Sequence, residues 1–285
     1  MVEYNPKSWL NLLFHSYSRY VFKRLLPALL YVTVYTSIIT YVFYELNIDF
    51  ISTTSVHSIL GIVLGFFLVF RTNGAYDRWW EGRKVWGELV NNTRNLAIKF
   101  SIMVPMNHPE RGYISECISA YPRALKDHLR EGVPAEVAAE LVEKLKMENL
   151  DHIPNAIAKR LIGITNKLKG EKVMDPEQYR VLDGELKSLT DIMGKCERIR
   201  NTPIPYSYSM FMKKFIFAYI ATLPFAFVTV YHYWTILIVV LILYILMSIE
   251  LLAEEIEDPF GSDINDLPTD ILAGKIDKNV KEIFG

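Results

Sequence analysis

The fold is decided by two adjoining stretches: residues 55–70, SVHSILGIVLGFFLVF, and residues 71–97, RTNGAYDRWWEGRKVWGELVNNTRNLA. The first is apolar for about 15 residues, or roughly 22 Å of α-helix, which is less than the thickness of the hydrocarbon core of a bilayer. The second carries charged and aromatic residues in a helical pattern. We therefore predict a short membrane helix that is surrounded by protein or water and runs on into a polar helical region.

Three other segments are apolar enough to span a membrane. Residues 25–46 supply a full bilayer crossing, and residues 211–231 and 233–252 supply two more. Little beyond His232 separates the last two, so they must form an antiparallel hairpin with a very short turn. With 51% hydrophobic residues overall, the chain is predicted to be a membrane protein with four spanning helices.

Lysine and arginine residues set the predicted orientation. They precede the first span, follow the second and precede the third, whereas the turns at 47–54 and 231–234 contain none. By the positive-inside rule, both termini and the long segment between spans two and three are cytoplasmic. The predicted division is a cytoplasmic N-terminal segment 1–24, membrane hairpin 25–72, cytoplasmic helical region 73–210, membrane hairpin 211–253, and an acidic turn with a C-terminal tail 254–285.

The cytoplasmic segment has helical periodicity and no strand pattern, so we predict an all-α fold. The expected helices cover residues 75–102, 113–129, 135–145 and 176–199. Cys117 and Cys196 match no metal or disulfide spacing and are expected to be reduced thiols. The net charge of −1 gives no global field that would attract nucleic acid.

An apolar stripe runs along the helix at residues 55–70. Ser58, Ile62, Phe66 and Phe70 recur every four residues and share one face, while Gly61 and Gly65 lie on an adjoining face. If several copies of this helix surround an axis, the bulky residues form stacked apolar rings, and a narrow apolar segment can stop ions by losing its water. Packing between helices explains the same spacing, so the spacing alone does not establish a pore.

The stretch 71–97 resembles the corresponding helix of the bestrophin family, which consists of homopentameric ion channels. A second motif, EEIEDPFGSDINDLP at residues 254–268, resembles the acidic segment of the same family, and CERIRNTPIPYSY at residues 196–208 lies between the two. The resemblance implies that Ile62, Phe66 and Phe70 form a hydrophobic pore neck. It also implies a passive channel for small monovalent ions, assembled as a homopentamer in the inner membrane of a bacterium.

Counting back without gaps from residues 196–205 places the family's second, cytoplasmic constriction at Glu177. Relatives carry an aliphatic residue there, and a ring of glutamates would attract cations. We therefore predict a preference for cations, with a chloride-selective channel as the alternative. A surface glutamate in the first turn of a helix that begins with Pro176 explains the same residue equally well.

The acidic turn gives a candidate calcium site. Eukaryotic bestrophins bind calcium there through a continuous acidic run, and Asp263 and Asp266 could supply two of the oxygen ligands. Ser262, Ile264 and Asn265 interrupt the run in this chain, so calcium stays an open possibility and no other cofactor is expected. The alternative is a structural turn whose glutamates pair with basic residues of neighbouring helices.

Other function classes find less support in the sequence. The six histidines form no catalytic or HExxH pattern, there is no phosphate-binding glycine loop, and no catalytic residues are expected. A secondary transporter, the further alternative, would require broken helices and charges at mid-depth in the membrane. Apart from Glu250, near a helix end, no such charge is present.

Overall fold

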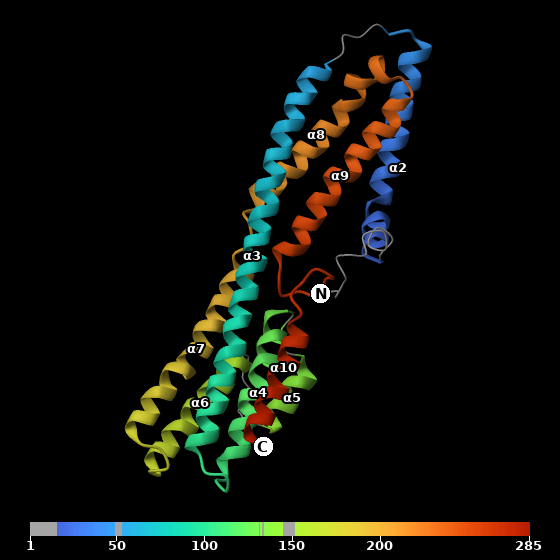
Figure 1. The fold of residues 1–285 in the computed structure, drawn as a ribbon. Coiled ribbons are helices and arrows are strands. Elements are labelled where there is room, and N and C mark those ends of the chain that lie inside the picture. Colours follow the sequence, from blue (N-terminus) through green and yellow to red (C-terminus); the bar gives the residue numbers. More distant parts are fainter. Residues whose placement is uncertain (1–15, 49–52, 131, 133, 145–151) are drawn as a thin grey trace. The chain divides into compact units, whose positions relative to one another are not determined.

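A computed structural model describes residues 16–48, 53–130, 132, 134–144 and 152–285 of the chain. These residues form helices and no strands, which confirms the predicted all-α fold (Figure 1). The part of the predicted N-terminal segment before residue 16 lies outside the described residues. The helices are α2 (Ser16–Glu45), α3 (Thr54–Met103), α4 (Glu110–Leu129), α5 (Ala135–Lys144), α6 (Ile153–Gly170), α7 (Pro176–Asn201), α8 (Tyr206–Tyr231), α9 (Trp234–Glu257) and α10 (Thr269–Phe284).

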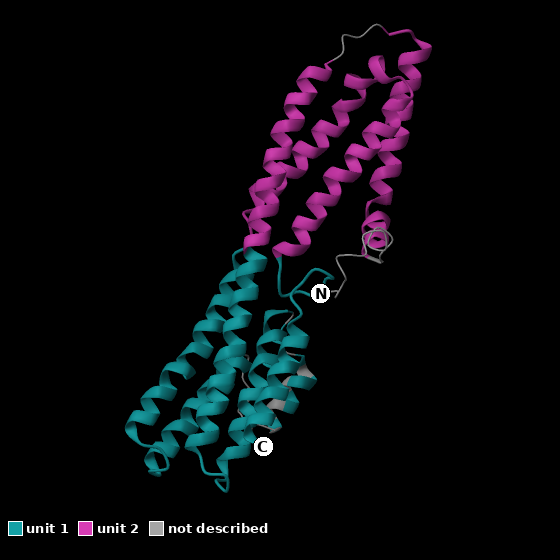
Figure 2. Cartoon of the chain, viewed as in Figure 1, with its two compact units in different colours: residues 1, 78–202, 258–285 teal, residues 2–77, 203–257 magenta. Residues whose placement is uncertain are grey.

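The described chain divides into two compact units (Figure 2). The membrane unit comprises residues 16–77 and 203–257, and the bundle unit comprises residues 78–202 and 258–285. Helix α3 contributes to both, because it continues for 50 residues without a break. The short apolar stretch at residues 55–70 is therefore the first part of one long helix.

The membrane unit contains α2, the first part of α3, α8 and α9. All four spanning helices predicted from hydropathy are present, each long and apolar enough to cross a bilayer. Leucine, isoleucine and valine side chains from the four helices form the core of this unit. Between α8 and α9, His232 adopts a left-handed conformation with φ of 49°, which reverses the chain within the predicted short turn.

The bundle unit has its own apolar core around the second part of α3. Trp86, Phe100 and Tyr121 are fully buried there, together with apolar side chains of α4, α6, α7 and α10. Cys117 and Cys196 lie in this core as free thiols, and burial raises the pKa of each to about 12. This unit is thus held together by ordinary close packing of amphipathic helices.

Two helices of the bundle unit were not expected. Helix α6 begins after His152, whose ring accepts a hydrogen bond from the Asn155 amide, and has Pro154 in its first turn. Helix α10 occupies most of the predicted C-terminal tail and packs against α4. Its apolar residues Leu272, Ile276, Val280 and Ile283 recur at helical spacing and pack on the core. The sequence therefore carries a helical signal here that the expectation of a tail overlooked.

Phe100 tests the core of the bundle unit. Replacing Phe100 by alanine should lower the free energy of unfolding by about 3–5 kcal/mol, because a fully buried aromatic side chain leaves a cavity. Ile102 lies on the same helix and is 78% exposed, so Ile102→Ala is the matched control. Thermal unfolding of the detergent-solubilised protein measures both. Equal shifts for the two variants would contradict this description of the core.

Candidate ion-conduction site

The predicted neck residues lie on the outer surface of the membrane unit. Ile62 is 63% exposed, Phe66 is 64% exposed and Phe70 is 66% exposed within the single chain. Large apolar side chains that a chain leaves uncovered in this way face lipid or another protein surface. The α3 face that bears them is therefore available to line a pore between several copies of the chain.

The opposite face of α3 is buried in its own unit. Leu64 and Leu68 are buried in the core, and the His57 ring is hydrogen-bonded with the backbone carbonyl of Thr53 at 3.1 Å and with Thr222 Oγ1 at 3.0 Å. At Gly61, a Cβ atom would meet the hydroxyl of Tyr219 at 2.8 Å, so glycine permits the close approach of α8. These contacts fix the rotation of α3 about its axis.

Directly after Phe70, a buried cation ties α3 to α9. Arg71 is 1% exposed, and its guanidinium Nη2 lies 2.6 Å from Glu257 Oε2. Its Nε lies 3.6 Å from Glu250 Oε1. Glu257 also accepts the backbone amide of Ile204 at 2.8 Å. This cluster was not predicted as part of the site, although an arginine at the end of an apolar run and a glutamate near the end of α9 were visible in the sequence.

Glu177 lies in the bundle unit, in the first turn of α7. Asp175 caps that helix in a capping box with Gln178, and Pro176 occupies the first turn, as a helix-entry signal requires. The Glu177 side chain is 79% exposed and lies 3.5 Å from the Arg180 guanidinium. Val181, one turn further on, is also exposed. The local structure is that of a solvated helix start whose negative charge has a positive neighbour.

Asp263 and Asp266 lie in one turn of the bundle unit. The Asp263 amide donates to Asp266 Oδ2 at 2.5 Å, and Asp266 is buried while Asp263 is exposed. The Arg130 guanidinium donates to the carbonyl oxygens of Phe260 and Gly261 at 3.3 and 3.1 Å. Within the described residues, no third acidic, histidine or cysteine side chain joins the two aspartates as a set of metal ligands. Calcium binding at this turn stays a prediction.

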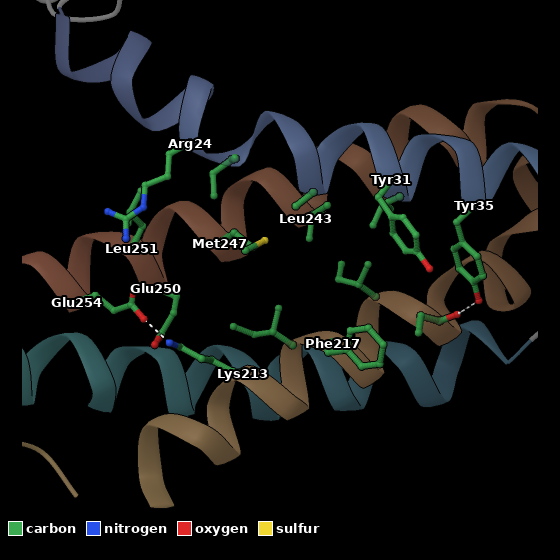
Figure 3. A pocket seen from close by; sticks show the side chains of 16 residues that line it. Arg24, Tyr31, Tyr35, Lys213, Phe217, Leu243, Met247, Glu250, Leu251 and Glu254 are labelled. Atoms are coloured by element: carbon green, nitrogen blue, oxygen red, sulfur yellow. Dashed lines mark hydrogen bonds and ion pairs between the residues drawn. The ribbon is translucent and has the colours of Figure 1, made fainter. Parts of the chain in front are cut away.

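Two of the glutamates that precede this turn, Glu254 and Glu257, pair with basic residues, as the structural alternative for the acidic segment expects. Glu254 Oε1 lies 2.5 Å from the Lys213 ammonium, and Glu257 binds Arg71. The Lys213–Glu254 pair lies at one end of a groove of about 730 Å³ between α2, α8 and α9 (Figure 3). Arg24 and Glu250 line the same end, so two cations face two carboxylates. The groove therefore has no net charge with which to select an ion.

Arg71 provides a test of the buried cluster. Arg71→Met should destabilise the protein by about 3–5 kcal/mol, because it leaves Glu250 and Glu257 without the cation that compensates their burial. Thermal unfolding in detergent measures this, with Lys214→Met, an exposed lysine of the same unit, as the control. Adding Glu257→Gln to Arg71→Met should recover part of the loss. No recovery would mean that charge compensation is not what Arg71 supplies.

Comparison with known proteins identifies the family. The family model that describes the bacterial/fungal bestrophin proteins matches residues 1–282 of this chain. A voltage-dependent anion channel-forming protein of Nostoc is 37% identical over 78% of this chain and 75% of its own length. One from Mesorhizobium japonicum is 32% identical over 93% of this chain and 86% of its own length. A crystal structure of a bacterial bestrophin homologue from Klebsiella pneumoniae superposes with a TM-score of 0.81 at 29% identity, covering 92% of this chain and 99% of that one. The chain therefore belongs to the bacterial and fungal bestrophin family of ion channels.

Proposed function

We propose that this chain forms a passive anion channel whose neck is lined by Ile62, Phe66 and Phe70 from several copies of α3. The observation that carries the proposal is the exposure of these three side chains on a helix whose other face is buried. We further propose a homopentamer in a bacterial inner membrane with cytoplasmic termini, as the family resemblance and the lysine and arginine distribution imply.

The physical role of the neck follows from its chemistry. Three successive turns of α3 present only apolar side chains, so several copies would form rings without a polar group to replace the hydration shell of an ion. A narrow passage of this kind conducts when it is wet and closes when it loses its water. In this proposal, widening the rings favours the wet state and narrowing them favours the closed state.

The charge preference is proposed to be for anions, which replaces the cation preference expected from Glu177. Relatives that share about a third of their residues with this chain are named as anion channel-forming proteins. The basis for cation selectivity is weak, because Arg180 lies beside Glu177 and offsets its charge. In addition, the edge of a phenyl ring is the positive end of its quadrupole, so Phe66 and Phe70 favour an anion wherever their edges point to the axis.

A transporter with alternating access has less support. Such proteins usually place substrate and coupling-ion sites at mid-membrane, between discontinuous helices. Here the buried glutamate of α9, Glu250, is beside Arg71 in a cluster that links two helices. Helices α3, α8 and α9 are continuous through the membrane unit.

Phe66 tests the neck. Phe66→Ala should raise the unitary conductance or the open probability in planar bilayers, because removing the ring widens and wets the passage. Val56→Ala is the control: Val56 is exposed on the same helix, about 80° around the axis from Phe66. Currents of Phe66→Ala that match those of the wild type would refute the assignment of this stripe to the pore.

Arg180 and Glu177 test the second constriction. With different salt concentrations on the two sides of the bilayer, we expect the wild-type reversal potential to lie near the equilibrium potential of the anion. Arg180→Gln should move it toward the cation side by leaving the carboxylate unbalanced, and adding Glu177→Gln should restore it. Reversal potentials that are the same in all three proteins would place this pair outside the permeation path. A wild-type potential on the cation side would contradict the proposed anion selectivity.

A further inference from the structure

Three potential metal ligands meet in the bundle unit, on residues that the proposed pore does not use. His128 lies near the end of α4, His152 caps the start of α6, and Glu197 lies on α7. The Nε2 atoms of His128 and His152 lie 2.8 and 3.0 Å from the same oxygen, Oε1 of Glu197. The two imidazole rings are 4.2 Å apart between centroids. Nothing in the spacing of these residues along the chain predicts that they meet.

The spacing of the three ligand atoms fits a tetrahedral metal ion. All three lie within 4.8 Å of one another. Zinc bound to imidazole nitrogen and carboxylate oxygen has bonds of about 2.0–2.2 Å, which separate tetrahedral ligand atoms by about 3.3–3.6 Å. Each imidazole therefore has to move away from the carboxylate oxygen by only a few tenths of an ångström, which side-chain torsions allow.

We propose that His128, His152 and Glu197 form a binding site for Zn²⁺, with water as the fourth ligand. Two imidazoles and one carboxylate are ligands that zinc accepts, whereas calcium and magnesium prefer oxygen ligands alone. All three side chains are partly exposed, so an ion and its water molecule can reach them. This site is separate from the turn that holds Asp263 and Asp266.

A metal at this position links three helices of the bundle unit. Helices α4, α6 and α7 each contact the other two. Arg200 of α7 already donates to the backbone carbonyl of His128 at 2.9 Å, so the end of α4 is held against α7 before any metal binds. His152 at the start of α6 also lies 3.0 Å from Glu197 of α7. Bound zinc should stabilise this junction further, because an ion that binds only the folded state raises the free energy of unfolding.

The carboxylate is ready for a metal ion at neutral pH. Burial would raise the pKa of Glu197, but hydrogen bonds from His152 and His128 outweigh that effect and hold the pKa below its ordinary value. Glu197 is therefore ionised, and each imidazole directs Nε2 toward it. Without a metal, the same three side chains form a hydrogen-bonded cluster, and an experiment has to distinguish this cluster from a zinc site.

The cap of α6 gives a way to distinguish the two readings. His152 Nδ1 accepts the Asn155 amide at 3.3 Å, so without a metal the imidazole proton is on Nε2. Zinc on Nε2 requires that proton to be on Nδ1, and the bond from the Asn155 amide is then lost. This bond is long and therefore weak, so its loss opposes zinc binding only slightly. Hydrogen exchange of the Asn155 amide should become faster when zinc is bound.

Zinc titration of the full-length protein tests the proposal. The protein, purified without a polyhistidine tag and stripped with EDTA, should bind one Zn²⁺ per chain, and added Ca²⁺ should not displace it. His152→Ala and the conservative Glu197→Gln should each weaken binding at least about tenfold. His108→Ala is the matched control, since His108 has one carboxylate partner, Glu171 at 3.5 Å, and belongs to no set of three ligands. Its affinity for zinc should equal that of the wild type.

Two outcomes would overturn the proposal. One is the absence of zinc binding to wild-type protein that elutes as a folded oligomer. The other is an unchanged zinc affinity in both His152→Ala and Glu197→Gln. X-ray absorption at the zinc edge adds a structural readout, because the proposal requires two imidazole ligands in the wild type and one in His152→Ala. Both the titration and the spectrum are independent of ion conduction, so a failure of the proposed channel function leaves this test intact.

Discussion

The buried ion pairs of Arg71, together with the packing of Leu64 and Leu68, determine how α3 is oriented in the membrane unit. An isolated guanidinium in an apolar interior costs several kcal/mol, so Arg71 has to face the carboxylates of Glu250 and Glu257 on α9. Adjacent residues of an α-helix point about 100° apart. With Arg71 directed inward, Phe70 and the residues four and eight positions before it are directed outward. A polar contact inside the subunit thus places the apolar stripe on its surface.

The exposed stripe also explains why a single chain is incomplete. A large apolar side chain on the surface of a membrane helix faces either lipid or another protein surface. Ile62, Phe66 and Phe70 are each more than 60% exposed in the single chain. If copies of α3 surround an axis, as the proposed neck requires, these side chains face one another and the stripe is enclosed.

Most of the fold was predictable because its signals are local. Hydropathy gives the four spans, and periodicity gives α4, α5, α7 and the second part of α3. Helix α10 was missed although Leu272, Ile276, Val280 and Ile283 recur at helical spacing, because residues 254–285 were taken as an acidic turn with a tail. The assignment of Ile62, Phe66 and Phe70 to a pore neck rests on spacing and family resemblance together and stays a prediction. The contacts of Arg71 and of the histidines depend on which helices pack together, and no local pattern records that.

The contrast between Glu177 and Glu250 shows where sequence reasoning about charge is limited. Glu177 suggested an ion-selective ring by position, and it lies exposed beside Arg180 at a helix start that Asp175 caps. Glu250 was only noted as a charge near a helix end, yet it is buried beside Arg71 of α3. Burial decides the difference: water hydrates an exposed charge and weakens its interaction with other charges, while a charge in the protein interior must be matched by a fixed partner. Because burial is a property of the packed helices, the role of a charge in this channel can be assigned only after the packing is known.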